Sequence, residues 1–139
     1  MKKVPVVYLE DDQNSLEIVH FILSVIMGFE NVHVWDSSAN VLEKVRKLPQ
    51  LPGLILLDIH MDPLDGFAVM KLLRQQQEFK EVRIVALTAS FMKEEVSTLK
   101  SAGFDGGIAK PIDRDTFPTI VERILNGEEV WDVAGTGSP

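Results

Sequence analysis

Short, uninterrupted apolar runs alternate along the chain with longer segments in which apolar residues recur at helical spacing. An uninterrupted apolar run is typical of a strand that is covered on both faces, as in a parallel sheet. Strands are therefore expected at 4–9, 32–35, 54–57, 82–87 and 105–108. Helices are expected at 13–28, 38–48, 65–77, 91–102 and 113–126, and Gly28, Pro49 and Gly103 are typical stop signals at helix ends.

This strict alternation predicts an α/β fold. Five βα units joined by right-handed connections give an open, doubly wound parallel sheet with helices on both faces. Periodicity alone leaves the strand order open, but the flavodoxin-like order 2-1-3-4-5 is the common one for a chain of 139 residues. We expect one domain over residues 1–126. Because helical periodicity is lost after Gly127, residues 127–139 are expected to form a C-terminal tail or the start of a linker.

The acidic composition narrows the classes of partner. A formal net charge of -7 opposes direct binding to nucleic acid or to anionic lipid, because both require clustered Lys and Arg. The lack of cysteine excludes disulfide bonds and thiolate chemistry, and it suits a reducing cytosol. The acidic run at 10–12 interrupts the N-terminal segment before a signal peptide could form. The sequence therefore predicts a cytoplasmic protein that binds neither nucleic acid nor membrane directly.

Candidate functional residues follow the expected strands, at the edge where ligands bind in a doubly wound sheet. These residues are Glu10-Asp11-Asp12 after the first strand, Asp58 after the third, Thr88 after the fourth and Lys110 after the fifth. Crowded carboxylates repel one another unless a cation joins them, and an oxygen-only set of ligands favours Mg²⁺. We expect Asp11, Asp12 and Asp58 to form such a set.

A carboxylate at this edge can also act as a nucleophile toward phosphorus, provided that nearby cations neutralise the transferred oxygens. Asp58 would be that nucleophile, Lys110 a cation, and the Thr88 hydroxyl a group that detects the phosphoryl oxygens. Each residue has a plainer explanation by itself; Asp12, for example, could simply cap the first helix. Their joint occurrence at one sheet edge favours a functional site.

The arrangement resembles the receiver domain of response regulators in two-component signalling. The resemblance covers about residues 4–126, and its motifs are Asp11-Asp12, Asp58-Ile59-His60-Met61, Asp65-Gly66, Leu87-Thr88-Ala89 and Lys110-Pro111. It implies that Asp58 is the phosphoacceptor and that Asp11, Asp12, Asp58 and the backbone carbonyl of His60 hold Mg²⁺. It also implies that Thr88 is the switch hydroxyl and that Lys110 contacts the phosphate.

By the same resemblance, the phosphoryl donor is a phosphohistidine of a sensor histidine kinase or of a histidine phosphotransfer protein. The modified domain then signals by a conformational change or by protein–protein interaction. Such a domain phosphorylates and dephosphorylates itself without converting an external substrate, so we do not class it as an enzyme.

Two positions depart from the family pattern at the site. Asp62 stands where a proline is usual, and Gly107 stands where the switch aromatic is usual, three residues before Lys110. Gly107 supports an alternative function, a degenerate receiver that acts as an interaction module without phosphorylation. A haloacid-dehalogenase-type phosphatase is disfavoured because His60 replaces the second aspartate of its motif. An FMN-binding module is disfavoured because acids follow the first strand instead of a phosphate-binding loop.

The first expected helix has more apolar surface than one buried face needs. Leu16, Val19, Leu23 and either Ile26 or Met27 are expected to pack on the sheet. A second apolar stripe consists of Ile18, Phe21, Ile22 and Val25. We interpret this stripe as a docking surface for a histidine kinase or for a second copy of the chain. The alternative is a deeply buried helix, covered by Val130 and Trp131 of the tail.

Overall fold

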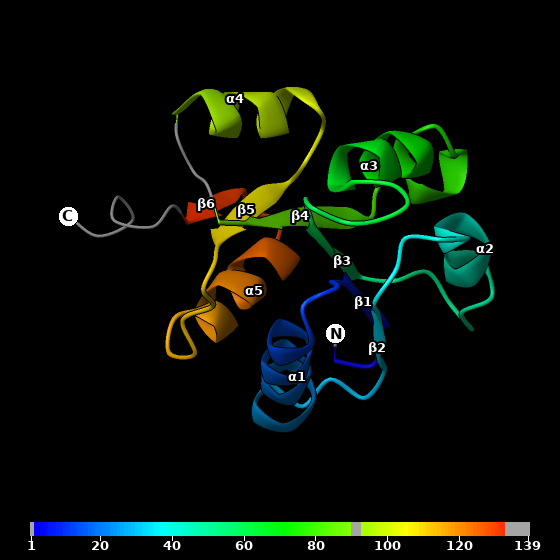
Figure 1. The fold of residues 1–139 in the computed structure, drawn as a ribbon. Coiled ribbons are helices and arrows are strands. Elements are labelled where there is room, and N and C mark those ends of the chain that lie inside the picture. The colour runs from blue at the N-terminus through cyan, green and yellow to red at the C-terminus, as the bar shows by residue number, and fades with distance from the viewer. Residues whose placement is uncertain (1, 90–92, 133–139) are drawn as a thin grey trace.

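The computed structural model describes residues 2–89 and 93–132 as a sheet between two layers of helices (Figure 1). The strands are β1 (Val6–Leu9), β2 (Val32–Trp35), β3 (Leu54–Asp58), β4 (Arg83–Thr88), β5 (Gly106–Ala109) and β6 (Val130–Asp132). The helices are α1 (Gln13–Phe21), α2 (Val41–Arg46), α3 (Gly66–Arg74), α4 (Lys93–Ser101) and α5 (Phe117–Leu125), with a π-helical stretch at Ile22–Ile26 and a 3-10 turn at Gln77–Phe79. Residues 91 and 92 of the helix expected at 91–102, and residues 133–139 of the expected tail, lie outside the described residues.

All strands of the sheet are parallel, in the order β2-β1-β3-β4-β5-β6. The expected flavodoxin-like α/β fold with a parallel sheet is confirmed. The expected number of five strands is wrong, because β6 comes from the segment that was assigned to a tail. A strand of three residues is too short to show a periodicity, and its pairing depends on the edge of β5.

The two faces of the sheet are covered by different helices. In Figure 1, α1 and α5 lie on one face, while α2, α3 and α4 lie on the other. Along β1, Val6 and Tyr8 belong to the core cluster beneath α1 and α5, whereas Val7 and Leu9 belong to the cluster on the opposite face. Burial on both faces explains why the strands appear in the sequence as uninterrupted apolar runs.

The π-helical stretch changes which side chains the first helix exposes. The Met27 amide donates to the carbonyl oxygen of Ile22 at 2.8 Å, five residues back, so this turn is wider than an α-helical turn. After Ile22 each residue therefore advances less around the helix axis. As a result Ile26 is exposed, as Ile18 and Val25 are, while Met27 packs on the core.

This geometry corrects the expected apolar stripe. Ile22 is fully buried, so its assignment to an exposed stripe is wrong. The exposed side chains are Ile18, Phe21, Val25 and Ile26, and we call these four residues the α1 patch. The alternative, in which Val130 and Trp131 cover this helix, is also wrong, because β6 pairs with β5.

The sixth strand depends on a glycine of β5. A Cβ atom at Gly106 would lie only 2.8 Å from the carbonyl oxygen of Val130, so β6 approaches β5 at a place where only glycine fits. The Val130 side chain is buried in the cluster beneath α5. Trp131 packs against the opposite cluster, where the Lys100 ammonium lies 5.4 Å from the centre of its ring. β6 is therefore a packed strand of the sheet.

Gly106→Ala should separate β6 from β5, because the added methyl group would collide with the Val130 carbonyl. We expect the free energy of unfolding, measured by urea denaturation, to fall by about 1–3 kcal/mol. The matched control is the same substitution in a chain that ends at Gly127. There the methyl group meets no β6 carbonyl and should cost much less; an equal loss in both chains would contradict the close approach.

Candidate functional site

The strands place the candidate residues at one edge of the sheet. β1 and β3 are neighbours with Leu9 opposite Leu57, so Glu10 and Asp58 follow at adjacent positions. Lys110 comes directly after β5, and its side chain reaches back across the edge toward both acids. The parallel order of the sheet therefore brings these charged groups together.

Three carboxylates meet at this edge. Oxygen atoms of Glu10, Asp11 and Asp58 all lie within 4.8 Å of one another. Glu10 is fully buried, Asp58 is nearly so, and Asp11 is exposed. The inner side of the cluster is thus buried and its outer side, at Asp11, is open to solvent, so a hydrated ion can enter.

Asp12 takes a different role from the one expected. Its side chain accepts hydrogen bonds from the Ser15 amide at 2.9 Å and from the Ser15 hydroxyl at 2.7 Å, so it caps α1. The set of carboxylates that meet is therefore Glu10, Asp11 and Asp58, in place of the expected Asp11, Asp12 and Asp58. Glu10 was among the candidate residues after the first strand, but the expected metal set did not include it.

Lys110 places a cation at this edge of the sheet. Its ammonium group lies 2.8 Å from Glu10 Oε1 and 3.7 Å from Asp58 Oδ2. Glu10 Oε1 also accepts a hydrogen bond from the hydroxyl of Tyr8 at 2.7 Å. One ammonium group thus offsets part of the charge of three carboxylates.

The buried charges perturb one another. The pKa of Asp58 is raised to about 7, first by burial and then by the adjacent Glu10 carboxyl, while the His60 amide and Lys110 oppose the shift. Burial alone would raise the pKa of Glu10, but hydrogen bonding with Asp58, Lys110 and Tyr8 outweighs it and leaves that pKa below its ordinary value. Without a metal ion, the folded protein therefore keeps a proton on Asp58 up to nearly neutral pH.

The structure also brings His60 and Thr88 to this edge. The His60 amide donates to Asp58 Oδ1 at 3.1 Å, so its backbone lies at the site while its side chain is exposed. Thr88 is buried at the end of β4, and its carbonyl oxygen accepts a hydrogen bond from the Lys110 amide at 2.9 Å. Asp62 is exposed and is not part of the three-carboxylate cluster.

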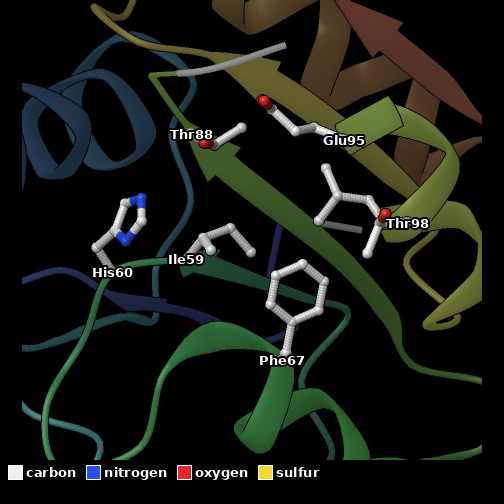
Figure 2. Close-up of a pocket in the computed structure, with 7 residues that line it drawn as sticks. Ile59, His60, Phe67, Thr88, Glu95 and Thr98 are labelled. Carbon is white, nitrogen blue, oxygen red and sulfur yellow. The ribbon is translucent and has the colours of Figure 1, made fainter. Parts of the chain in front are cut away.

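A hollow of about 400 Å³ adjoins Thr88 (Figure 2). Figure 2 shows Phe67 of α3 and Thr98 of α4 on its walls, with Ile59, His60 and Thr88 also lining it. Its lining is mainly apolar, and it extends from Ile59 and Thr88 to Thr98 and Leu99 of α4. A change near Thr88 therefore has space in which side chains between α3 and α4 can rearrange.

The position of the absent switch aromatic lies against β6. Gly107 is paired with Ala86 of β4 and with Trp131 of β6. Ala86 belongs to the core cluster on the α4 side, and Trp131 packs against the same cluster. An indole from β6 therefore lies beside the β5 position that has no side chain.

Among the residues that the structure describes, no helix is long and apolar enough to cross a bilayer.

Tyr8 was not among the candidate residues, and Glu10 was left out of the expected metal set, for a reason that the strand explains. Side chains two apart on a strand point to the same face, so Tyr8 and Glu10 share the face beneath α1 and α5. The sequence signal that could have identified the pair was the hydroxyl of Tyr8, two residues before the acid Glu10 at the end of the strand. Apolar pattern alone assigns Tyr8 to the core, which is correct for its ring.

Comparisons with known proteins agree with this arrangement. The family model described as the response regulator receiver domain matches residues 6–122. The polar-differentiation response regulator DivK of Brucella ovis is 27% identical over 119 residues, which are 86% of this chain and 91% of that protein. The signal transduction histidine-protein kinase BarA of Shigella flexneri is 26% identical over 125 residues, but these are 90% of this chain and only 13% of the kinase.

A solved structure shows the same fold. The receiver domain of the sensor histidine kinase PA1611 from Pseudomonas aeruginosa, with a magnesium ion coordinated in its active site cleft, superposes with a TM-score of 0.77. The two chains are 22% identical, and the match covers 89% of this chain and 98% of that one.

The raised pKa of Asp58 predicts a pH-dependent stability in the absence of metal. The folded protein holds the Asp58 proton up to about pH 7, whereas the unfolded chain releases it near the ordinary value of 3.8. Stability from this group is therefore full below about pH 4 and is lost as the pH rises toward 7, by an amount on the order of a few kcal/mol. Melting temperatures in EDTA across this range should show the loss.

Asp58→Asn is the control for this prediction, because it removes the titrating group and keeps the side-chain shape. The wild-type protein should lose stability relative to the variant as the pH rises from 4 to 7. Parallel curves for the two proteins would show that Asp58 titrates in its ordinary range.

Proposed function

Since the chain belongs to the response regulator receiver domain family, we propose that Asp58 accepts a phosphoryl group from a phosphohistidine of a histidine kinase or of a phosphotransfer protein. The main support is the geometry at the sheet edge. A nearly buried Asp58 lies within reach of the Lys110 ammonium and of two further carboxylates that can hold a cation.

The donor set of this edge fits Mg²⁺. Its side-chain ligand atoms are all carboxylate oxygens, and one of the three acids is exposed, which suits a hard ion that keeps several of its waters. Glu10, Asp11 and Asp58 would hold the ion, and the backbone of His60 lies beside them. When bound, Mg²⁺ would neutralise charge on the transferred phosphoryl oxygens.

Asp58 is the nucleophile in this proposal. One of its carboxylate oxygens forms a bond to phosphorus while the bond between phosphorus and the donor imidazole nitrogen breaks, and that nitrogen keeps the electron pair. Asp58 must be ionised for this step. The positive charge of Lys110 helps to remove its proton and then faces the phosphoryl oxygens. The Thr88 hydroxyl, at the end of the neighbouring strand, is the group that detects them.

The α1 patch is the proposed docking surface for the phosphoryl donor. Two shallow hollows extend it toward the segment between β5 and α5: Ile26 lines one with Ile112 and Pro118, Phe21 lines the other with Glu17, and Arg114 belongs to both. This segment begins with Lys110, so a helical partner on the patch would lie close to the proposed phosphorylation site. A second copy of the chain is the alternative occupant.

Other parts of the proposal extend beyond this chain. The chain spans 13% and 8% of the histidine kinases BarA of Shigella flexneri and mak1 of Schizosaccharomyces pombe, so the activity and partners of a whole protein stay proposals. We propose that the domain modifies only itself and converts no external substrate. The cytoplasmic location and the lack of direct nucleic-acid or membrane binding stay predictions from the sequence.

Asp58 is expected to be the one phosphorylated residue. Incubation with acetyl phosphate and Mg²⁺ should add a single phosphate, detected by intact mass, because Asp58 ends β3 with Glu10, Asp11 and Lys110 all within reach. Asp58→Asn and EDTA should each abolish the adduct, whereas Asp62→Asn, outside the carboxylate cluster, should retain it. An adduct that persists without Asp58 would refute the mechanism, and a wild-type protein that is never labelled would favour the phosphorylation-independent interaction module.

The double substitution Phe21→Glu and Val25→Lys should weaken transfer from a phosphorylated kinase or phosphotransfer protein by about tenfold or more, because it places charge in the α1 patch. Both side chains are exposed, so labelling by acetyl phosphate should persist. Leu51→Glu is the matched control, since Leu51 is an exposed apolar residue outside this patch. Unfolding of the double variant would identify the patch as core. A change in sedimentation without a change in transfer would identify a homodimer surface.

A further inference from the structure

The single tyrosine of the chain joins the hydrophobic core to the acidic site. Tyr8 is fully buried in β1, and its ring belongs to the core cluster beneath α1 and α5. Its hydroxyl donates to Glu10 Oε1 at 2.7 Å. A buried hydroxyl needs a partner, and here that partner is a carboxylate of the proposed metal site.

The two oxygens of Glu10 have different surroundings. Oε1 accepts hydrogen bonds from Tyr8 and from Lys110, at 2.7 and 2.8 Å. Oε2 accepts from the Asp12 amide at the longer distance of 3.2 Å. Two strong donors therefore fix Oε1, and this fixes the orientation in which the carboxylate meets Asp11 and Asp58.

Lys110 has two acceptors to choose between. Its ammonium group lies closer to Glu10, at 2.8 Å, than to Asp58, at 3.7 Å. If Lys110 turns toward a phosphoryl group on Asp58, the buried Oε1 of Glu10 loses a charged donor. A buried carboxylate oxygen without a donor is costly, and the Tyr8 hydroxyl keeps this one paired.

We propose that Tyr8 is a positioning residue, which orients Glu10 toward the Mg²⁺ ion and keeps it hydrogen-bonded when Lys110 turns to the phosphoryl group. This inference rests on the proposed function and assigns a role within that same site. A purely structural Tyr8 would use its ring to fill the core, and loss of the hydroxyl would then alter stability without altering the site.

Tyr8→Phe tests the proposal because it removes one oxygen atom and keeps the ring. Groups that orient metal ligands typically change metal affinity by about tenfold or more when removed. We expect the Kd for Mg²⁺, measured by isothermal titration calorimetry on the full chain, to rise by about tenfold. The rate of labelling by acetyl phosphate at saturating Mg²⁺ should also fall, because Glu10 then holds Lys110 more firmly.

A double-mutant cycle with Glu10→Gln separates positioning from packing. If Tyr8 acts through Glu10, adding Tyr8→Phe to Glu10→Gln should change the Mg²⁺ affinity little further. Val121→Ala is the control for packing, since Val121 belongs to the same core cluster as the Tyr8 ring. It should lower stability and leave the Mg²⁺ affinity unchanged.

The outcomes distinguish this inference from the function on which it rests. A wild-type protein that neither binds Mg²⁺ nor is labelled would refute both. A wild-type protein that does both, with an unchanged Mg²⁺ Kd in Tyr8→Phe, would overturn the positioning role alone. The same role would also fail if Tyr8→Phe weakened Mg²⁺ binding equally with and without Glu10.

A second measurement applies even if Tyr8→Phe does not fold. Because the chain has one tyrosine, ¹³C labelling of the tyrosine Cζ, the ring carbon that bears the hydroxyl, gives a single NMR resonance. This resonance should shift when Mg²⁺ binds to the wild-type protein, and the shift should be lost in Glu10→Gln. A tyrosine resonance whose chemical shift does not change on addition of Mg²⁺ would overturn the proposal.

Discussion

The site depends on two like charges that the sheet forces together. Glu10 directly follows β1, and Asp58 is the last residue of the neighbouring parallel strand β3, so their carboxyl groups meet in a place that is almost closed to water. Lys110 offsets one of them at most. The remaining negative charge must be neutralised by a proton or by a metal cation. The raised pKa of Asp58 shows that, without a metal ion, a proton does this. The fold thus favours the binding of a proton or a cation at Asp58, the residue proposed to accept a phosphoryl group.

Much of this arrangement could be predicted because it follows from chain order. Uninterrupted apolar runs identify buried parallel strands, and parallel strands end at one edge, which places Asp58 and Lys110 together. The choice between Glu10 and Asp12 could not be made in this way. Successive side chains after a strand point in different directions, so an uncertainty of one residue in the strand end decides whether an acid faces the site or caps a helix.

The predictions for the exposed face of the first helix and for the C-terminal segment were wrong because distant contacts or an unusual turn override the local pattern of apolar residues. Periodicity assumes a regular α-helix, but the π-helical stretch turns Ile26 outward, and Ile22 is buried in the core. β6 depends on a glycine more than twenty positions earlier, because Gly106 leaves room for the Val130 carbonyl. A pattern confined to residues 130–132 contains no trace of that contact.

The two glycines of β5 both shape its contact with β6. Gly106 admits β6 to the sheet, and Gly107 has no side chain where the Trp131 indole lies across from it. The ring that β5 lacks is therefore matched by a ring on the next strand, held beside α4 by Lys100. The contacts run from Thr88, whose carbonyl accepts the Lys110 amide, through β5 to β6. Backbone pairing therefore connects the region around the proposed phosphorylation site to β6.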